Sequence, residues 1–391
     1  MSEWLSIIGI GENGLKDLSE ASREALERAE AVFGSPRHLA MVEHPGKIPW
    51  PVPFSLGPLL ALRGRPVAAL ASGDPFWHGA GGSLAQELPS GEWRAYPGIS
   101  VPSLVATRLG WRLEEVTCLG LHAAPLEQLR RHLTEDARLI VTLRDGAAPS
   151  ALAGYLTSLG FGSSVLHVME HVGGPKERIC RHAAEDTLPV FENLVACAIE
   201  VRGGKGLPQV PGLADDLFDH DGQITKRPIR ALALSALAPR PGELLWDLGA
   251  GSGSVGIEWL LSHPRNRALG VERDPGRAAR ARTNARSLGV PQFEIREGSA
   301  LELMPDLPAP DAVFIGGGLD AALLDALWAS LPAGTRIVAH GVTLETESLL
   351  AGAQARLGGT LLRIELSQAA PLGSKSGWKA SYPVVQWSVT R

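Results

Sequence analysis

The sequence has few of the features that mark secreted, membrane-embedded or zinc-binding proteins. It has three cysteines, Cys118, Cys180 and Cys197, and no CxxC pair. This excludes a disulfide framework and a zinc finger, and we expect a reduced, cytoplasmic protein. No stretch approaches the ~20 consecutive apolar residues of a membrane-spanning helix. Glu3 stands where a signal peptide would carry a positive charge, so we expect no targeting segment and no membrane partner.

The sequence also lacks an excess of charge of either sign. Lys and Arg number 37 against 42 Asp and Glu, which gives a net charge of -5. A chain without a basic field is not expected to bind nucleic acid generally, so an anionic ligand must be met by a local pocket. At roughly 150 residues per domain, the 391 residues predict two or three domains.

The first half predicts an α/β fold. Residues 5–10 form a short apolar run that ends in glycines, and Ser19 is placed to cap the helix that follows. The apolar runs 66–71 and 139–143 also end in glycine turns, as buried strands of an α/β sheet do. Residues 203–217 are rich in Gly and Pro without periodicity, so we place the domain boundary there, giving domains 1–205 and 206–391.

The second half alternates strands and helices regularly, which predicts a doubly wound, mostly parallel, Rossmann-like sheet. Its last two strands have no helix between them, so they must form a terminal antiparallel pair. The expected strands are 243–248, 268–272, 293–297, 311–315, 335–339, 359–366 and 383–389; the expected helices are 228–237, 253–262, 275–288, 320–330 and 345–357.

A glycine-rich loop lies between the first strand and helix of this second half. Glycines at such a point let the backbone approach a cofactor closely. Glu272 ends the next strand about 20 residues later, where an acidic side chain can accept hydrogen bonds from ribose hydroxyls. Small residues after the third strand leave room for an adenine ring beside Ala300. The cofactor-binding residues predicted here are Asp247, Gly249, Ala250, Gly251, Ser252, Gly253, Glu272 and Ala300.

The same loop also contains a formal GxGxxG, Gly251 to Gly256, so NAD remains an alternative to S-adenosylmethionine. Three features favour the methyl donor, the first being the small residues at the end of the third strand, where an adenine could lie flat. Asp247 lies two residues before the first glycine, where a carboxylate can face a cationic amino group, and the terminal antiparallel pair is typical of Rossmann-like methyltransferases.

With these features the second half resembles the class I S-adenosylmethionine methyltransferases. The preceding segment, Asp221-Gly-Gln-Ile-Thr-Lys226, more specifically resembles the decarboxylating precorrin methyltransferases of cobalamin (vitamin B12) biosynthesis. The resemblance implies that Thr225 packs over the cofactor. A plain helix cap for the helix at 228–237 is the alternative role for this residue.

The first half is similar to the tetrapyrrole (corrin/porphyrin) methyltransferases, which hold their cofactor between two α/β lobes. The similarity rests on four short motifs in order. It implies that Gly73, Asp74 and Ser100 lie at the cofactor cleft, although Asp74 before Pro75 also suits a turn. Glu12 and Asn13 depart from the family, which usually has a proline there. The motifs are residues 7–11, 72–75, 96–100 and 173–179.

A chain with both halves resembles the enzymes that methylate precorrin-6Y at carbons 5 and 15 and release the ring C acetate as carbon dioxide, giving precorrin-8. This implies a tetrapyrrole substrate, S-adenosylmethionine as cofactor and a homo-oligomer. By analogy, the second half acts at carbon 15 and decarboxylates, and the first half acts at carbon 5. The macrocycle is its own electron sink, so we name no catalytic base.

A substrate with many carboxylates needs cations, and a flat macrocycle suits an aromatic side chain. Segments that could rim the pocket carry such residues, and a solvated surface is the alternative for each of them. The candidates are Lys226, Arg230, Lys375, Trp378 and Lys379.

Two other interpretations are weighed here. His167-Val-Met-Glu-His171 spells an inverted zinc-protease motif, but that motif needs a helix, and residues 164–170 alternate like a strand, so we expect no metal. The second half could instead methylate another small molecule or a tRNA, with the first half serving as a non-catalytic scaffold.

Overall fold

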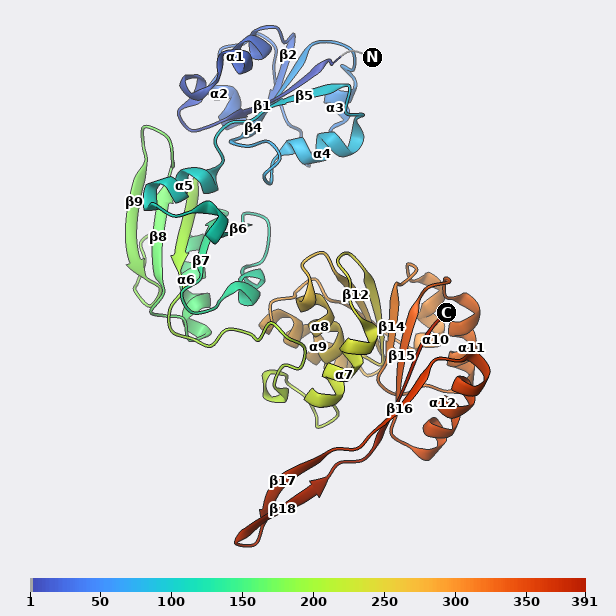
Figure 1. Ribbon diagram of the computed structural model, residues 1–391. Helices are drawn as coiled ribbons and strands as arrows, with labels where there is room; N and C mark the ends of the chain where they lie inside the picture. The colour runs from blue at the N-terminus through green and yellow to red at the C-terminus, as the bar shows by residue number, and fades with distance from the viewer. Residues whose placement is uncertain (1–2) are drawn as a thin grey trace. The chain divides into compact units, whose positions relative to one another are not determined.

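The computed structural model describes residues 3–391, and the chain forms two compact units (Figure 1). The N-terminal unit extends to Lys205, and the C-terminal unit begins at Gly206 and also includes Glu127–Arg131. The division falls in the Gly- and Pro-rich segment. Each unit has its own sheets and its own buried apolar clusters, so each is described by itself.

The N-terminal unit begins with a parallel sheet in the order β3-β2-β4-β1-β5. Ser19 caps α1 as predicted, because its side chain accepts a hydrogen bond from the Ser22 amide at 3.1 Å. Apolar side chains cover both faces of the sheet. The elements are β1 (Leu5–Ile10), α1 (Glu20–Glu27), β2 (Ala31–Gly34), α2 (Pro36–Ala40), β3 (Lys47–Pro49), α3 (Gly57–Leu60), β4 (Val67–Ser72), α4 (Ala80–Glu87) and β5 (Trp93–Tyr96).

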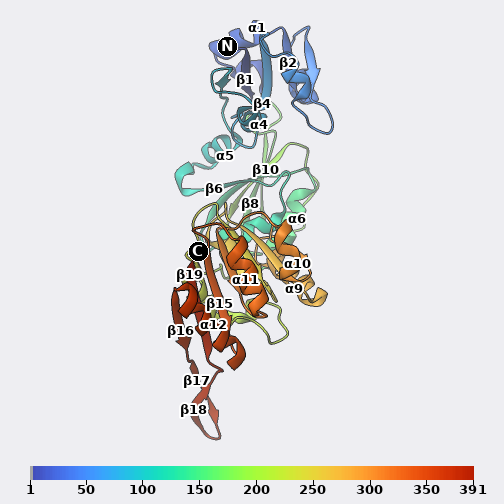
Figure 2. The same cartoon turned by 90° about the vertical axis from the view of Figure 1, so that its right-hand side faces the viewer.

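A second, mixed sheet completes this unit, so the two-lobed α/β arrangement is confirmed (Figure 2). Its order is β6-β7-β10-β8-β9, with β6 parallel to β7 and the other pairs antiparallel. The elements are α5 (Val101–Leu109), β6 (Thr117–Gly120), β7 (Arg138–Thr142), α6 (Ala148–Ser158), β8 (Val165–Glu170), β9 (Arg178–Ala183) and β10 (Val195–Glu200).

The C-terminal unit is a seven-stranded sheet in the order β13-β12-β11-β14-β15-β19-β16. Helices cover both faces, and two apolar clusters fill the space beneath them. The elements are α7 (Arg227–Leu237), β11 (Leu244–Leu248), α8 (Ser254–Ser262), β12 (Arg267–Glu272), α9 (Pro275–Ser287), β13 (Glu294–Glu297), α10 (Ala300–Leu303), β14 (Ala312–Ile315), α11 (Ala321–Ser330), β15 (Arg336–Gly341), α12 (Leu344–Leu357), β16 (Thr360–Ile364) and β19 (Val384–Thr390).

The predicted doubly wound sheet with a terminal antiparallel pair is confirmed. The strands from β13 to β15 are parallel, and β19 runs antiparallel between β15 and β16. The sequence analysis did not predict the hairpin of β17 (Ser367–Leu372) and β18 (Lys375–Ala380), which lies between the two terminal strands. Among residues 3–391 no helix is long and apolar enough to cross a membrane.

Candidate functional site

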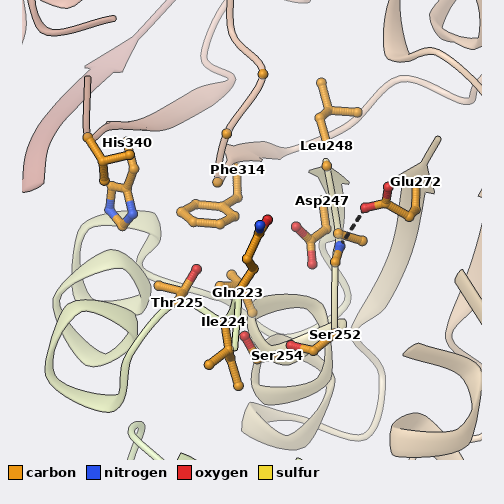
Figure 3. Close-up of a pocket in the computed structure, with 18 of the residues that line it drawn as sticks. Gln223, Ile224, Thr225, Asp247, Leu248, Ser252, Ser254, Glu272, Phe314 and His340 are labelled. Atoms are coloured by element: carbon orange, nitrogen blue, oxygen red, sulfur yellow. Dashed lines mark hydrogen bonds between the residues drawn. The ribbon is translucent and has the colours of Figure 1, made fainter. Parts of the chain in front are cut away.

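The candidate site lies where the strand order of the C-terminal sheet reverses. β12 and β13 lie on one side of β11, and β14 and β15 lie on the other. Open α/β sheets bind ligands in the crevice at the carboxyl ends of the strands at such a point. Here a cavity of about 1230 Å³ opens, with the glycine loop, Glu272, Phe314 and His340 in its wall (Figure 3).

The glycine loop turns directly from β11 into α8. Gly249, Gly251 and Gly253 have φ values of 75°, 56° and 76°, in the left-handed region that side chains with a Cβ rarely adopt. Glu272 holds this loop, because its carboxylate accepts hydrogen bonds from the Gly251 amide at 2.8 Å and the Asp274 amide at 2.9 Å. Glu272 therefore fixes the conformation of the loop.

Asp247 is a buried carboxyl group in the wall of the cavity. Burial raises its pKa to about 7, against the opposing effect of the Gly256 amide, which donates a hydrogen bond to it at 2.9 Å. The nearby charge of Glu272 raises the pKa further. A carboxyl group in this state is stabilised by a cation placed beside it.

A segment before α7, here named the roof segment (residues 212–226), contributes Gln223, Ile224 and Thr225 to the wall (Figure 3). Lys226 of the same segment also lines the cavity. Lys226 is the N-cap of α7, and no side chain caps this helix. The alternative role of Thr225 as a helix cap is therefore wrong.

On the other side of the cavity, β14 and β15 end in residues that the sequence analysis did not select. Phe314 and His340 lie edge to face, with ring centroids 5.1 Å apart. Nε2 of His340 lies 3.0 Å from Oε1 of Gln386, its partner in the β15–β19 register. Burial lowers the pKa of His340, against the opposing effect of its hydrogen bond with Gln386, and so favours the neutral ring. The signal that could have identified His340 in the sequence is its position as a polar residue at the end of an apolar strand.

Most of the predicted cofactor residues of the C-terminal unit do meet at this cavity. Gly253 is the exception, because it serves as the N-cap of α8 and packs toward Phe293. The predicted residues in the cavity wall are Thr225, Asp247, Gly249, Ala250, Gly251, Ser252, Glu272 and Ala300.

The predicted substrate residues divide into two groups. Lys226 and Lys379 line the cavity. Arg230 does not rim it, because its side chain is fully buried in ion pairs with Glu258 and Asp215. Lys375 and Trp378 lie on β18 and do not line it either. The sequence analysis had no signal for the hairpin that carries them.

In the N-terminal unit, glycines at three strand ends bring three backbones together. A Cβ on Gly9 would collide with the backbone of Gly73 and Gly98. Asp74 accepts a hydrogen bond from the Phe76 amide at 2.9 Å, as a turn residue does. Ser100 caps α5, accepting from the Ser103 amide at 3.2 Å.

Glu12, which departs from the family motif, joins the two lobes of this unit. Its carboxylate pairs with Arg37 from the first lobe and lies 3.2 Å from Nδ1 of His171 from the second. His167 lies on strand β8, so the zinc-protease geometry is absent. Within residues 3–391, no three His, Cys, Asp or Glu residues are grouped to hold a metal ion.

Two family profiles match the chain. Residues 5–187 match the tetrapyrrole (corrin/porphyrin) methylases, and residues 216–391 match the precorrin methyltransferase domain. The chain is thus an enzyme, a methyltransferase composed of two different methyltransferase domains.

Relatives with the same two-part organisation identify the family. A precorrin-6Y C(5,15)-methyltransferase [decarboxylating] of Sinorhizobium sp is 46% identical over all of this chain and 97% of its own. That of Mycobacterium tuberculosis is 39% identical over 98% of this chain and 99% of its own. The crystal structure of the C-terminal domain of the Rhodobacter capsulatus enzyme, 53% identical, covers 47% of this chain and all of its own, with a TM-score of 0.46. The chain belongs to the family of decarboxylating precorrin-6Y C5,15-methyltransferases.

Proposed function

We propose that this enzyme methylates precorrin-6Y at carbons 5 and 15 and decarboxylates the acetate on ring C, with S-adenosylmethionine as methyl donor. The observation that carries the proposal is that the two-domain relatives matched from end to end bear this activity in their names. It favours a precorrin acceptor over a tRNA or an unrelated small molecule.

The C-terminal cavity is proposed to bind S-adenosylmethionine. When bound, this cofactor supplies a methyl group on a cationic sulfonium. The proposed residues are Asp247 for the methionine amino group, Glu272 for the ribose, Ala300 for the adenine and the loop from Gly249 to Ser252 for close backbone approach. The raised pKa of Asp247 supports this role, because a carboxyl group that is buried without a cation gains one on binding.

The acceptor side of the cavity is proposed to hold the macrocycle for methylation at carbon 15 and decarboxylation. Lys226, Lys379 and Arg273 supply positive charge for the carboxylates of the substrate. Gly316, Gly317 and Gly318 follow β14 and leave space for a flat, bulky acceptor. The chain positions the substrate and excludes water, and the conjugated ring takes up the electrons that decarboxylation releases.

The N-terminal unit is proposed to act at carbon 5 with its own methyl donor. Its candidate cofactor residues are Gly73, Asp74 and Ser100, which follow strand ends of one sheet. The contact of Gly9 with Gly73 and Gly98 supports this site, because it brings Gly73 to the point where the ends of three neighbouring strands meet.

We also propose that the chain forms a homo-oligomer through the β17–β18 hairpin, which extends from the C-terminal unit (Figure 2). Trp378 and Leu372 on the hairpin are 80% and 70% exposed. An isolated two-stranded hairpin is marginally stable in water, and its free edges pair readily with another chain. In a dimer of this chain, each of the two copies would bury the same hairpin surface.

The decisive experiment is isothermal titration of S-adenosylmethionine, and separately NAD, into the full chain, followed by incubation with precorrin-6Y and labelled methyl donor. We expect two methyl donors bound per chain, no NAD binding, two methyl groups transferred and one carbon dioxide released. Binding of NAD in place of the methyl donor would refute the proposal.

A further inference from the structure

Arg230 is a buried cation, and its hydrogen bonds all go to the roof segment or to Glu258, which also binds that segment. Nε donates to Glu258 at 2.5 Å. Nη1 donates to the Thr225 carbonyl at 2.5 Å and to Asp215 at 3.1 Å, and Nη2 donates to the Leu213 carbonyl. The guanidinium therefore forms hydrogen bonds with backbone carbonyls at both ends of the roof segment.

Glu258, the anionic partner of Arg230, also forms hydrogen bonds with the roof segment. Glu258, 5% exposed, accepts hydrogen bonds from the backbone amides of Gly212 at 2.6 Å and Leu213 at 2.9 Å. Asp215 also accepts one from the Arg227 amide at 3.0 Å. Arg230 and Glu258, here named the clamp, thus fix backbone groups at both ends of the roof segment.

Stability alone does not account for the clamp. A buried ion pair pays a desolvation penalty that often cancels its attraction, and well-packed apolar residues can replace such a pair without loss of stability. What an arginine adds is a rigid, planar set of donors that several acceptors can share only in one arrangement. The clamp therefore specifies geometry.

The clamp sets the positions of two parts of the cavity wall, the roof segment and the glycine loop. Glu258 lies on α8, the helix that begins directly after the glycine loop, so the clamp joins the roof segment to that loop. Asn284, 2% exposed, makes a second link of the same kind. Its side chain donates to the Ser252 carbonyl of the loop and to the Asp219 carbonyl of the roof segment, both at 2.9 Å, and accepts from the Asp219 amide at 2.8 Å.

We infer that Arg230 is a positioning residue, which sets the distance between Thr225 in the roof segment and the glycine loop and thereby tunes the cavity to the methyl donor. This inference rests on the proposed function. It replaces the predicted role of Arg230 as a substrate ligand, since the guanidinium reaches only the protein.

The test removes the charges of the clamp while leaving its volume and one acceptor. In the full chain, Arg230→Met with Glu258→Gln keeps a side-chain oxygen for one of the Gly212 and Leu213 amides, which bind different oxygens of Glu258, and loses the hydrogen bond of Arg230 to the Thr225 carbonyl. The matched control is Arg336→Met with Glu243→Gln, a second arginine paired to glutamate and to a backbone carbonyl, at the opposite ends of the strands. Affinity is measured by ultraviolet crosslinking of tritiated S-adenosylmethionine, counting label in peptides of the C-terminal unit.

We expect the clamp variant to bind the methyl donor at least about tenfold more weakly, while its melting temperature stays close to that of the control variant. Trypsin should cleave after Lys226 faster in the clamp variant, and saturating methyl donor should slow this cleavage. If the double variant does not fold, Arg230→Lys serves instead, because it keeps the charge opposite Glu258 without the planar donors.

Wild-type affinity in a folded clamp variant, or an equal loss of affinity in the control, would overturn the inference and leave the proposed function standing. Absence of labelling in the wild-type C-terminal unit would instead refute the proposed function.

Discussion

Asp247 shows how the environment of one residue prepares a site for a cation. Its carboxyl group is enclosed by the sheet and has the Gly256 amide as a hydrogen-bond donor, and burial raises its pKa to about 7. The neutral carboxyl group has no charge that attracts a cationic ligand, whereas the ionised carboxylate attracts one. Binding of a cation and loss of this proton are therefore linked.

This linkage predicts the pH dependence of binding by the C-terminal unit. The protonated fraction of Asp247 grows as the pH falls through about 7, so affinity for S-adenosylmethionine should fall about fivefold between pH 7 and pH 6, where the amino group of the ligand stays largely protonated. Asp247→Asn should bind weakly with a flat profile. Glu297→Gln, which changes an exposed carboxylate outside the cavity wall, should keep the wild-type slope. Crosslinking at each pH measures both, and a flat wild-type profile would contradict the prediction.

Glu272 is a second single residue that shapes the site, because it holds the backbone of the glycine loop. Its two oxygens accept from the Gly251 and Asp274 amides, so Glu272→Gln replaces one acceptor by a donor that faces an amide. We expect affinity for the methyl donor in the C-terminal unit to fall at least about tenfold. Crosslinking at constant pH, with Glu294→Gln as control for an exposed carboxylate, measures it. Unchanged affinity would show that the loop holds its shape without this contact.

At the scale of elements, α8 lies closer to the sheet than a side chain at Gly256 permits. A Cβ there would collide with the ring of Phe293. Gly256→Ala should therefore destabilise the C-terminal unit by about 1–3 kcal/mol through overpacking. Gly352→Ala on α12, where a Cβ meets open space, should instead be neutral or stabilise by up to about 1 kcal/mol. Urea unfolding followed by circular dichroism distinguishes the two, and equal effects would refute the packing argument.

The β17–β18 hairpin is an element that can be removed without disturbing the sheet. The Ser381 amide donates to the Leu366 carbonyl at 2.9 Å, so the two strands leave the unit side by side. Replacing residues 369–378 by Asn-Gly should close a tight turn between the paired Gln368 and Lys379, and it keeps Lys379 for the cavity wall. We expect a folded chain of lower oligomeric state in light scattering. An unchanged oligomer would exclude the hairpin as the interface.

At the scale of the whole molecule, two unlike methyltransferase units on one chain predict two independent cofactor sites. Gly9→Ala, whose Cβ would collide with the backbone of Gly73 and Gly98, should remove the N-terminal site. Asp247→Asn should strongly weaken the C-terminal site alone. Calorimetry on full-length chains should then give one methyl donor per chain for each variant instead of two. Gly82→Ala, in open space on α4, is the control for the first variant. A wild-type stoichiometry of one would indicate that one unit is a scaffold.

The sequence by itself determined the class of fold, because the relevant signals are local. The period of apolar residues separated strands from helices, the glycine loop from Gly249 to Gly253 marked a strand-to-helix turn, and Glu272 followed at the expected distance. These features depend on neighbours in the chain, and the prediction of a doubly wound, mostly parallel sheet with a terminal antiparallel pair followed from them.

Only the tertiary structure decided what depends on contacts between distant residues. Arg230 resembled a surface cation by its helical position, but Glu258, 28 residues away, makes it a buried clamp. Trp378 and Lys375 lay near the expected pocket in sequence, yet a hairpin carries them away from its wall. His340 lies in the cavity wall because β15 pairs in parallel with β14, which brings His340 beside Phe314 at the carboxyl ends of the two strands. Burial and pairing are set by the folded chain as a whole, and no local pattern encodes them.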